Sequence, residues 1–255
     1  MAEFINTIDV LGDDAVIDSI IEKTITEFRD DVITTVGMYA FYYCTALTDV
    51  DLPNVTHVDK MSFSNCSALA RLNMPNLVTT ANEPFAHCTA LKSVSFPRLK
   101  TCESSLLRGC TNLETVDVPE LDAIPDFFVY QAKNSLKSVS CHAATSIGGY
   151  AFAQCTALTT VDAPCVNSIA NNAFEGCSNL AAVILRYDGV CALKNVNAFG
   201  NSAVSNGSAY VYAPRAHLDS YKAATNWNTY ESQFRALEDY TVDGTITGEL
   251  DETKI

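Results

Sequence analysis

The sequence has little positive charge, a single tryptophan and no long apolar run. Its 255 residues carry 16 Lys plus Arg against 30 Asp plus Glu, a net charge of -14. A chain this acidic repels phosphate backbones, which argues against nucleic-acid binding. No apolar run approaches the ~18 to 20 residues of a membrane-spanning helix, so we expect no membrane span. With 48% hydrophobic and 18% charged residues, the chain can bury a core and is not a wholly disordered polymer.

The motifs of several common enzyme classes are also missing. The sequence contains no P-loop, no G-x-G-x-x-G, no H-E-x-x-H and no G-x-S-x-G. Two His-Cys neighbours occur, at His87-Cys88 and Cys141-His142, but adjacent side chains point in different directions and make no obvious nucleophile–base pair. We therefore expect a protein that is not an enzyme, with no catalytic residue, no cofactor and no metal.

The charge is distributed unevenly along the chain. Residues 1–35 carry nine acidic and two basic side chains, residues 231–255 carry seven and two, and the middle is nearly neutral. Acidic ends keep a chain soluble or act as docking segments, and both interpretations stay open. The first residues show no basic segment followed by an apolar one, so no signal peptide is visible. The chain then stays inside the cell, is a trimmed part of a longer protein, or leaves by another route.

A repeat of 22 residues runs through the middle of the chain. An apolar residue, usually Phe, lies three positions before each cysteine of the repeat, a Leu three after it, a Val or Leu six after it, and in most units a Pro nine after it. Ala132 takes the place of one cysteine, and one extra residue follows it within 133–135. Seven units fit between about residues 36 and 187, and residues 198–214 suggest an eighth, degenerate unit. The cysteines that reveal the repeat are Cys44, Cys66, Cys88, Cys110, Cys155 and Cys177.

Repeated apolar columns of this kind predict a solenoid, because one unit of this length cannot bury its apolar side chains alone. The stretch from the Leu to the Pro alternates apolar and polar residues, as in Asp49-Val50-Asp51-Leu52, and predicts a strand. The proline then ends the ladder pairing. The Ala-Phe-x-x-Cys stretch places Phe and Cys three apart, which predicts a short helix or 3₁₀ turn on the opposite wall.

This pattern resembles the leucine-rich repeats of the bacterial surface-antigen type, often called BspA-like, with the motif I-G-x-x-A-F-x-x-C-x-x-L-x-x-V-x-x-P. The clearest copy runs from Ile147 to Leu158 and on to Val161 and Pro164. The resemblance covers roughly residues 36–190. It departs in unit 4, where Leu106-Leu107 replaces Ala-Phe, and in unit 5 at Ala132. It implies an α/β repeat solenoid, a leucine-rich-repeat right-handed superhelix of 22-residue units with caps at both ends.

The resemblance also implies a function. Members of the family are mostly surface-exposed proteins, so the chain is expected to be a non-enzymatic binding or adhesion module, extracellular or at the cell surface. It would present a solenoid surface to a protein or glycan partner on a host or neighbouring cell. The alternative is a phage or prophage virion component, tail-associated and structural or receptor-binding. The missing signal peptide favours this alternative, as does the stretch 221–227, which resembles the closing segment that follows such repeats in bacterial and prophage-encoded proteins. Ligand and oligomeric state stay open.

We predict four parts of the chain. Residues 1–35 form an N-terminal cap, with a short amphipathic helix over 12–22 and a first strand over 24–28. Residues 36–190 hold seven leucine-rich repeats. Residues 191–238 hold the degenerate last repeat and a C-terminal cap, with a helix over 216–224 and Trp227 closing the far end of the stack. Residues 239–255 are an acidic tail or connector.

The ten cysteines predict a ladder of buried thiols and argue against disulfides or a metal site. Stacked coils hold equivalent residues about 5 Å apart with parallel Cβ vectors, whereas a disulfide needs Cβ atoms ~3.8 Å apart. Spacings of 22 residues also lack the close cysteine pairs of zinc sites. Cys102 and Cys141 fall in inward columns. Cys165 and Cys191 fall outside the ladder, and one of them is a candidate accessible thiol.

The outward columns of the predicted strands are the candidate partner-binding face. Their side chains are small, hydroxylic or acidic, with one Arg and no aromatic residue, so the residue types that dominate binding hot spots are scarce there. An ordinary solvated sheet is the alternative interpretation. Ala182 and Ile184 continue the columns, while Tyr39, Tyr42 and Tyr43 are aromatic surface candidates elsewhere or seal the N-terminal end. The candidate residues are Asp49, Asp51, Arg71, Asn73, Ser93, Ser95, Thr115, Asp117, Ser138, Ser140, Thr160 and Asp162.

Overall fold

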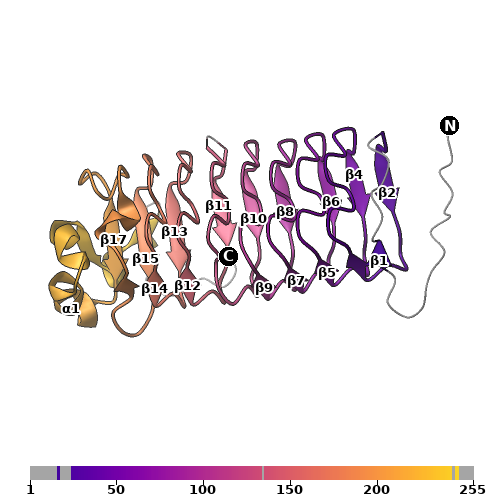
Figure 1. Cartoon of the computed structure of the whole chain (residues 1–255). Helices are drawn as coiled ribbons and strands as arrows, with labels where there is room; N and C mark the ends of the chain where they lie inside the picture. Colours follow the sequence, from indigo (N-terminus) through magenta and orange to yellow (C-terminus); the bar gives the residue numbers. More distant parts are fainter. Residues whose placement is uncertain (1–15, 18–23, 134, 243–244, 247–255) are drawn as a thin grey trace.

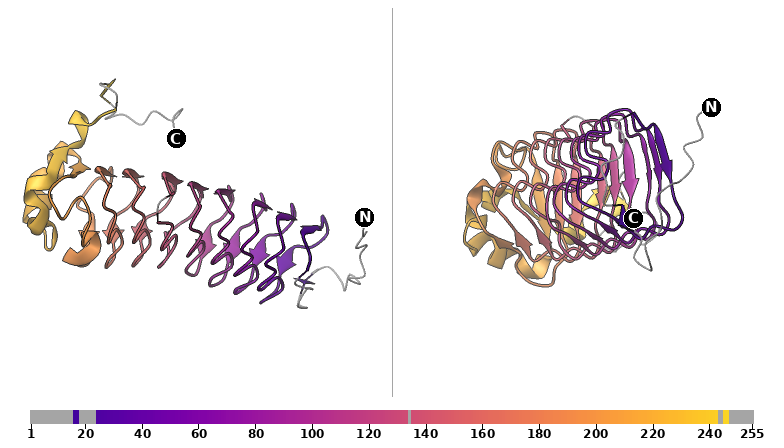
Figure 2. Two further views of the ribbon diagram at one scale, coloured as in Figure 1. Left: turned by 90° about the horizontal axis from the view of Figure 1, so that it is seen from above. Right: turned by 45° about the vertical axis from the view of Figure 1, so that its right-hand side comes forward.

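The computed structural model describes residues 16–17, 24–133, 135–242 and 245–246. The coils lie side by side along one axis, and each contributes one layer of a stack (Figures 1 and 2). The pairing register advances by 22 residues per coil, as in Val50 against Leu72. Across the extra residue it advances by 23, as in Val116 against Val139. The predicted repeat solenoid is therefore confirmed, and it is built from parallel β-sheets.

Each regular coil places a strand of three or four residues on one wall, here called the long-strand wall. A strand of two residues lies on a second, short-strand wall in most coils. The long strands are β2 (Glu27–Arg29), β4 (Asp49–Asp51), β6 (Arg71–Asn73), β8 (Ser93–Ser95), β10 (Thr115–Asp117), β11 (Ser138–Ser140), β13 (Thr160–Ala163), β15 (Ala182–Leu185), β17 (Tyr210–Ala213) and β18 (Phe234–Ala236). The short strands are β1 (Val16–Ile17), β3 (Thr35–Val36), β5 (His57–Val58), β7 (Thr79–Thr80), β9 (Thr101–Cys102), β12 (Ser146–Ile147), β14 (Ser168–Ile169) and β16 (Ala192–Leu193).

The Ala-Phe-x-x-Cys stretch, where a short helix or 3₁₀ turn was expected, forms a third wall of hydrogen-bonded turns without a helix. Twice in each regular unit, five residues and one residue before the cysteine position, the backbone takes a positive φ, for example 60° at Tyr39 and at Tyr43. Left-handed residues at this spacing end a right-handed helix. They also direct alternate N–H groups to the next coil: those of Tyr39, Phe41 and Tyr43 donate to its carbonyl oxygens at 2.7 to 3.1 Å. The turn wall therefore has its own inter-coil ladder.

The apolar columns fill the interior of the stack, as the repeat predicts. The rings of successive coils stack, with centroids 4.6 Å apart for Phe41 and Phe63 and 5.3 Å apart for Phe152 and Phe174. In units 4 and 5, aliphatic side chains take the Phe position and are also fully buried. Each stacked aromatic pair contributes about 0.5–1.5 kcal/mol beyond its buried area.

The thiols of the ladder are buried, and those of Cys66, Cys88, Cys110, Cys155 and Cys177 donate hydrogen bonds to backbone carbonyl oxygens. Cys66 Sγ donates to the carbonyl oxygen of Phe41 in the preceding coil at 3.0 Å, and Cys88 repeats this contact with Phe63 at 3.2 Å. Burial raises the pKa of the Cys66 and Cys110 thiols to about 12, so they remain protonated donors at neutral pH. The prediction of a buried thiol ladder is confirmed.

The other cysteines differ in exposure. Cys141 and Cys191 are buried and Cys102 is half-buried, whereas Cys165 is exposed. Of the two cysteines outside the ladder, Cys165 is therefore the accessible one.

At the N-terminal end, Val16–Ile17 form strand β1, paired in parallel with β3, where a helix was expected. Two adjacent β-branched residues suit a strand better than a helical turn. The rest of the expected helix lies outside the described residues. Strand β2 falls close to the predicted first strand.

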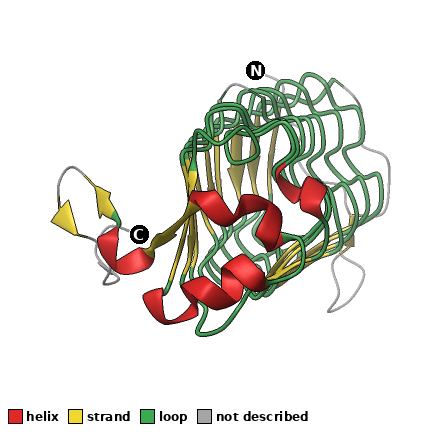
Figure 3. Ribbon diagram, turned by 90° about the vertical axis from the view of Figure 1, so that its left-hand side faces the viewer, coloured by secondary structure: helices red, strands yellow, loops and turns green. Residues whose placement is uncertain are grey.

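The C-terminal end is closed by short helices packed against the last coils (Figure 3). Trp227 is fully buried there, as predicted, and its Nε1 donates to the carbonyl oxygen of Cys191 at 2.6 Å. The predicted helix over 216–224 is present as α1. The helices are η1 (Val196–Phe199), η2 (Arg215–His217), α1 (Leu218–Ala223), η3 (Trp227–Gln233) and η4 (Leu237–Asp239), followed by the antiparallel pair β19 (Thr241–Val242) and β20 (Thr245–Ile246). The boundaries of the four parts stay predictions.

Candidate partner-binding face

The twelve candidate residues lie on strands of the long-strand wall, in two rows that cross six coils. Alternate residues of a strand point to opposite sides of the sheet, so each row holds one outward position per coil. Pairing aligns these positions, with Asp49 opposite Arg71 and Asp117 opposite Ser140. The structure therefore brings all twelve residues onto one wall.

This wall is divided into three sheets, with strand orders β2-β4-β6, β8-β10-β11 and β13-β15-β17-β18. A hollow of about 250 Å³ lies over β4 and β6 and reaches Ser93 of β8. Candidate residues from three coils line it, namely Asp49, Asp51, Arg71, Asn73 and Ser93. Most of the residues that line the hollow are polar.

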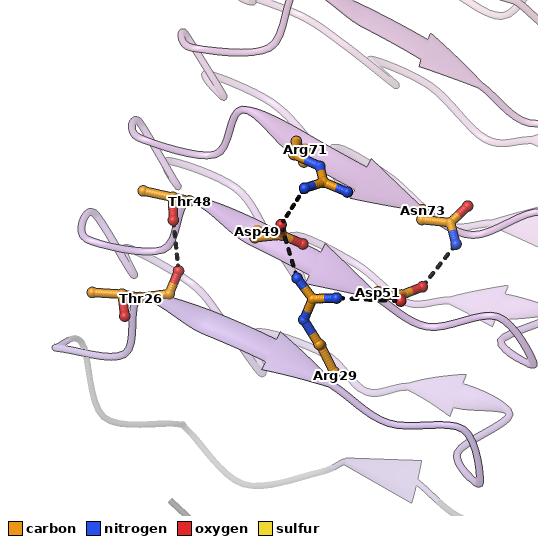
Figure 4. Close-up of polar contacts among 7 residues, drawn as sticks. All are labelled: Thr26, Arg29, Thr48, Asp49, Asp51, Arg71 and Asn73. Atoms are coloured by element: carbon orange, nitrogen blue, oxygen red, sulfur yellow. Dashed lines mark hydrogen bonds and ion pairs between the residues drawn. The ribbon is translucent and has the colours of Figure 1, made fainter. Parts of the chain in front are cut away.

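A network of charges holds the N-terminal part of the face (Figure 4). Asp49 Oδ2 lies 3.2 Å from Arg29 Nη2 and 3.3 Å from Arg71 Nη1, so one carboxylate joins three coils. Asp51 accepts a hydrogen bond from Asn73 Nδ2 at 2.7 Å and lies 3.8 Å from Arg29. The Asp49 side chain is only 12% exposed, whereas that of Arg71 is 76% exposed. Arg71 is therefore the more exposed of the two arginines in this network, since the Arg29 side chain is 53% exposed.

The middle of the face carries mainly hydroxyl groups. Ser93, Thr115 and Ser138 are exposed and lie in register across β8, β10 and β11. In the second row the hydroxyl of Ser95 donates to Asp117 Oδ2 at 2.8 Å. The acidic group is thus satisfied by its neighbour, and the three hydroxyls form an uncharged strip.

Near the C-terminal end, both carboxylate oxygens of Asp162 accept hydrogen bonds from the guanidinium of Arg186. Arg186 Nε lies 3.0 Å from Asp162 Oδ1, and Arg186 Nη2 lies 2.8 Å from Oδ2. Bidentate pairs of this kind are stronger and more specific than single charge contacts. Thr160 lies half-buried on the same strand.

Ala182 and Ile184 occupy the outward positions expected of them, but they are buried rather than exposed. They lie in register with Tyr210 and Tyr212 of the next coil, whose larger side chains stand on the same side of the sheet.

The last two strands, β17 and β18, carry aromatic and basic side chains at the C-terminal end of the face. None of them is among the twelve candidate residues. Arg235 lies over the ring of Tyr210, with its Cζ 4.1 Å from the ring centroid. Tyr240 contacts the ring of Tyr212 at a centroid distance of 4.6 Å, and burial beside Tyr240 raises the pKa of Tyr212. We call Tyr210, Tyr212, Arg235 and Tyr240 the aromatic end. Its signal in the sequence is the alternation Tyr210-Val211-Tyr212, which indicated only a degenerate unit.

The other candidates lie apart from this face. Tyr39, Tyr42 and Tyr43 contact one another edge to face on the turn wall, with ring centroids 5.3 and 4.6 Å apart. They therefore belong to a different surface of the solenoid.

The four histidines are half-buried, and the contacts of three involve oxygen atoms: His57 with Thr79, His142 with Ser140 and His217 with Asp188. Within the part of the chain that the structure describes, no group of three His, Cys, Asp or Glu side chains could hold a metal ion. No helix among the described residues has the length and apolar character needed to cross a bilayer.

Parallel coils of about 22 residues with Leu, Phe and Cys columns define a leucine-rich-repeat solenoid. The family model for the BspA type leucine rich repeat region matches residues 23–130 and 122–208, with six copies of the repeat. The chain belongs to this family.

Solved structures share the fold. A leucine-rich repeat protein from Eubacterium ventriosum is 20% identical with a TM-score of 0.54, over 71% of this chain and 44% of its own. A leucine rich repeat protein from T. pallidum is 24% identical with a TM-score of 0.53, over 74% of this chain and 81% of its own. The chain thus spans less than half the length of the Eubacterium protein. No curated protein matches the chain significantly.

Proposed function

We propose that the chain is a non-enzymatic binding or adhesion module that presents the long-strand wall to a protein or glycan partner. One observation carries the proposal: six consecutive coils align their polar side chains in two rows on one wall, with a hollow over β4 and β6. Ladders on three walls hold these coils in place, so little ordering is needed when a partner binds.

The twelve candidate residues are the proposed contact set, with exposed Arg71 and the strip Ser93, Thr115 and Ser138 at its centre. The family resemblance supports a place outside the cell or on its surface, and a partner on a host or neighbouring cell. The virion alternative stays a prediction, because no feature of the structure favours it.

A triple substitution tests the role of the strip. Ser93→Arg, Thr115→Arg and Ser138→Arg place three bulky charges on the face. The matched control, Thr101→Arg, Ala123→Arg and Asn167→Arg, changes exposed residues in or beside the short-strand wall. Both proteins and the parent are tested against a panel of purified host surface proteins and cell-wall glycans. We expect at least one ligand for the parent, with affinity reduced about tenfold or more by the face variant alone. No ligand, or equal losses in both variants, contradicts the proposal.

A further inference from the structure

One arginine of the long-strand wall has no carboxylate partner among the described residues. Five of the seven arginines form ion pairs, namely Arg29, Arg71, Arg108, Arg186 and Arg215. Arg98 donates to the side-chain oxygen of Asn76. Arg235 instead lies on the face of Tyr210, and its Nη1 donates to the backbone oxygens of Ser232 and Phe234 at 2.9 and 2.7 Å.

These contacts fix the guanidinium at the outer edge of the last long strand. The ring of Tyr210 and the two carbonyl oxygens hold it in place, so little side-chain entropy remains to be lost on binding. Its Nε and Nη2 groups have no acceptor in the described part of the chain. A carboxylate accepts two parallel N–H groups of an arginine, which gives geometric specificity as well as attraction.

A second cation lies beside Arg235. A hollow of about 440 Å³ borders β18 and the terminal helices, and both Lys222 and Arg235 line it. Glu231 also lines it, so the hollow carries a net positive charge in a chain whose overall charge is -14. Asn228, Thr229 and Ser232 add neutral hydrogen-bonding groups. The lining therefore suits a short anionic group with polar neighbours.

An apolar surface adjoins this cationic hollow. Tyr210 is 39% exposed, and Tyr212 lies two positions further along the same strand, on the same side of the sheet. Tyr and Arg are the residue types that most often dominate protein–protein hot spots, because each combines a large apolar body with a polar end. The aromatic end is continuous with the proposed face, since β17 pairs with β15 and β15 with β13.

We propose that the aromatic end and the adjoining hollow bind an acidic segment of a partner protein. A carboxylate of the segment binds Arg235 and Lys222, and an apolar side chain next to it packs on Tyr210 and Tyr212. The inference rests on the proposed function, because it assigns the chemistry of one end of the same face. A long polyanion is a poor occupant, since the rest of the acidic chain repels it.

Fluorescence anisotropy with a labelled, end-blocked peptide Glu-Leu-Glu-Leu-Glu tests the proposal. The control peptide carries Gln in place of each Glu. We expect the acidic peptide to bind the full chain and the Gln peptide to bind about tenfold more weakly or not at all. Equal binding of the two peptides, or no binding of the acidic one, overturns the proposal. An oligogalacturonate probe that binds through Arg235 more tightly than the peptide also overturns it, because the occupant would then be an acidic glycan.

Variants locate the binding. Arg235→Ala should lower the affinity for the acidic peptide about tenfold. Arg235→Lys should lower it less, because the positive charge remains although the two parallel N–H groups of the guanidinium are lost. Glu231→Gln should raise the affinity, because it removes a negative charge from the hollow. Arg98→Ala, on an exposed arginine away from this end, should change nothing. Circular dichroism establishes that Arg235→Ala is folded, and unchanged peptide affinity in that variant overturns the proposal. The acidic peptide could fail to bind while the triple variant of Ser93, Thr115 and Ser138 still abolishes binding of a ligand from the panel. That result would overturn the acidic-segment proposal and leave the proposed function intact.

Discussion

The regular coils and the C-terminal end of the stack bury their apolar side chains in different ways. In the coils, equivalent side chains of successive units stack on one another: Phe63 lies between Phe41 and Phe85, with centroid distances of 4.6 and 5.6 Å. At the C-terminal end, unlike side chains close the stack, with Trp227 and Tyr230 against Phe199. The repeat therefore uses one side-chain contact that recurs from coil to coil, whereas the end of the stack uses large aromatic side chains in an arrangement that occurs once.

The outer surface differs in the same way. In the coils, acidic groups are satisfied by the adjacent coil, as Asp49 is by two arginines and Asp117 by Ser95. At the end, Arg235 is held by a ring and by backbone oxygens, and its Nε and Nη2 groups meet no acceptor among the residues that the structure describes. The regular part thus supplies rigidity, and the irregular part supplies chemistry that the repeat does not contain.

Removing the plug should have the largest effect. Trp227→Ala leaves a cavity and deprives the Cys191 carbonyl of its donor, so we expect a loss of about 3–5 kcal/mol in the free energy of unfolding. Urea denaturation followed by far-UV circular dichroism measures it. Tyr187→Ala, at an exposed aromatic residue of the same end of the stack, should cost about 0.5 kcal/mol or less. Equal losses would show that no single plug closes the end.

Alkaline pH should weaken the coils through their thiols. Burial raises the pKa of Cys66, Cys110 and Cys177 to about 12, whereas an unfolded thiol titrates near ~8.5. The folded state therefore holds more protons between these values, and the stability that the protonated thiols confer is complete below pH ~8.5 and falls as pH rises toward 12. Each thiol should cost about 1.4 kcal/mol per pH unit in this window.

Urea midpoints between pH 8 and 10 measure this dependence. The double variant Cys66→Ala with Cys110→Ala should show a shallower fall, and Cys165→Ser, at the exposed thiol, should match the parent. A double variant with the slope of the parent would mean that the ladder thiols do not titrate as buried groups.

A smaller effect is expected at the charge network. Asp49→Asn removes the carboxylate shared by Arg29 and Arg71 and should cost about 1 kcal/mol, because both arginines stay largely solvated. The loss should shrink in 1 M NaCl, as thermal unfolding at low and high salt would measure. Asp122→Asn, at an exposed aspartate of another wall, is the control. A salt-independent loss would point to altered packing instead of lost charge pairing.

The sequence predicts the regular coils well, because the same positions are apolar in seven successive units and each unit therefore indicates the same buried side chains. The turn wall was harder, since Phe and Cys three apart fit a helical turn as well as a turn wall. The helical turn and the observed wall of turns differ in the positive φ at Tyr39 and its equivalents. The residue types at these positions do not reveal that backbone conformation. The aromatic end was missed because Tyr210-Val211-Tyr212 occurs once, and Arg235 reaches Tyr210 only through the pairing of β17 with β18.

Thiol labelling in the native protein tests most directly whether stacked coils seal their interior. A thiol-specific disulfide reagent at pH 7.5 should modify Cys165 quickly and Cys102 slowly, while urea should expose all ten thiols. Mass spectrometry of the labelled peptides identifies each site. Rapid native labelling of Cys44, Cys66, Cys88, Cys110, Cys155 or Cys177 would contradict the account.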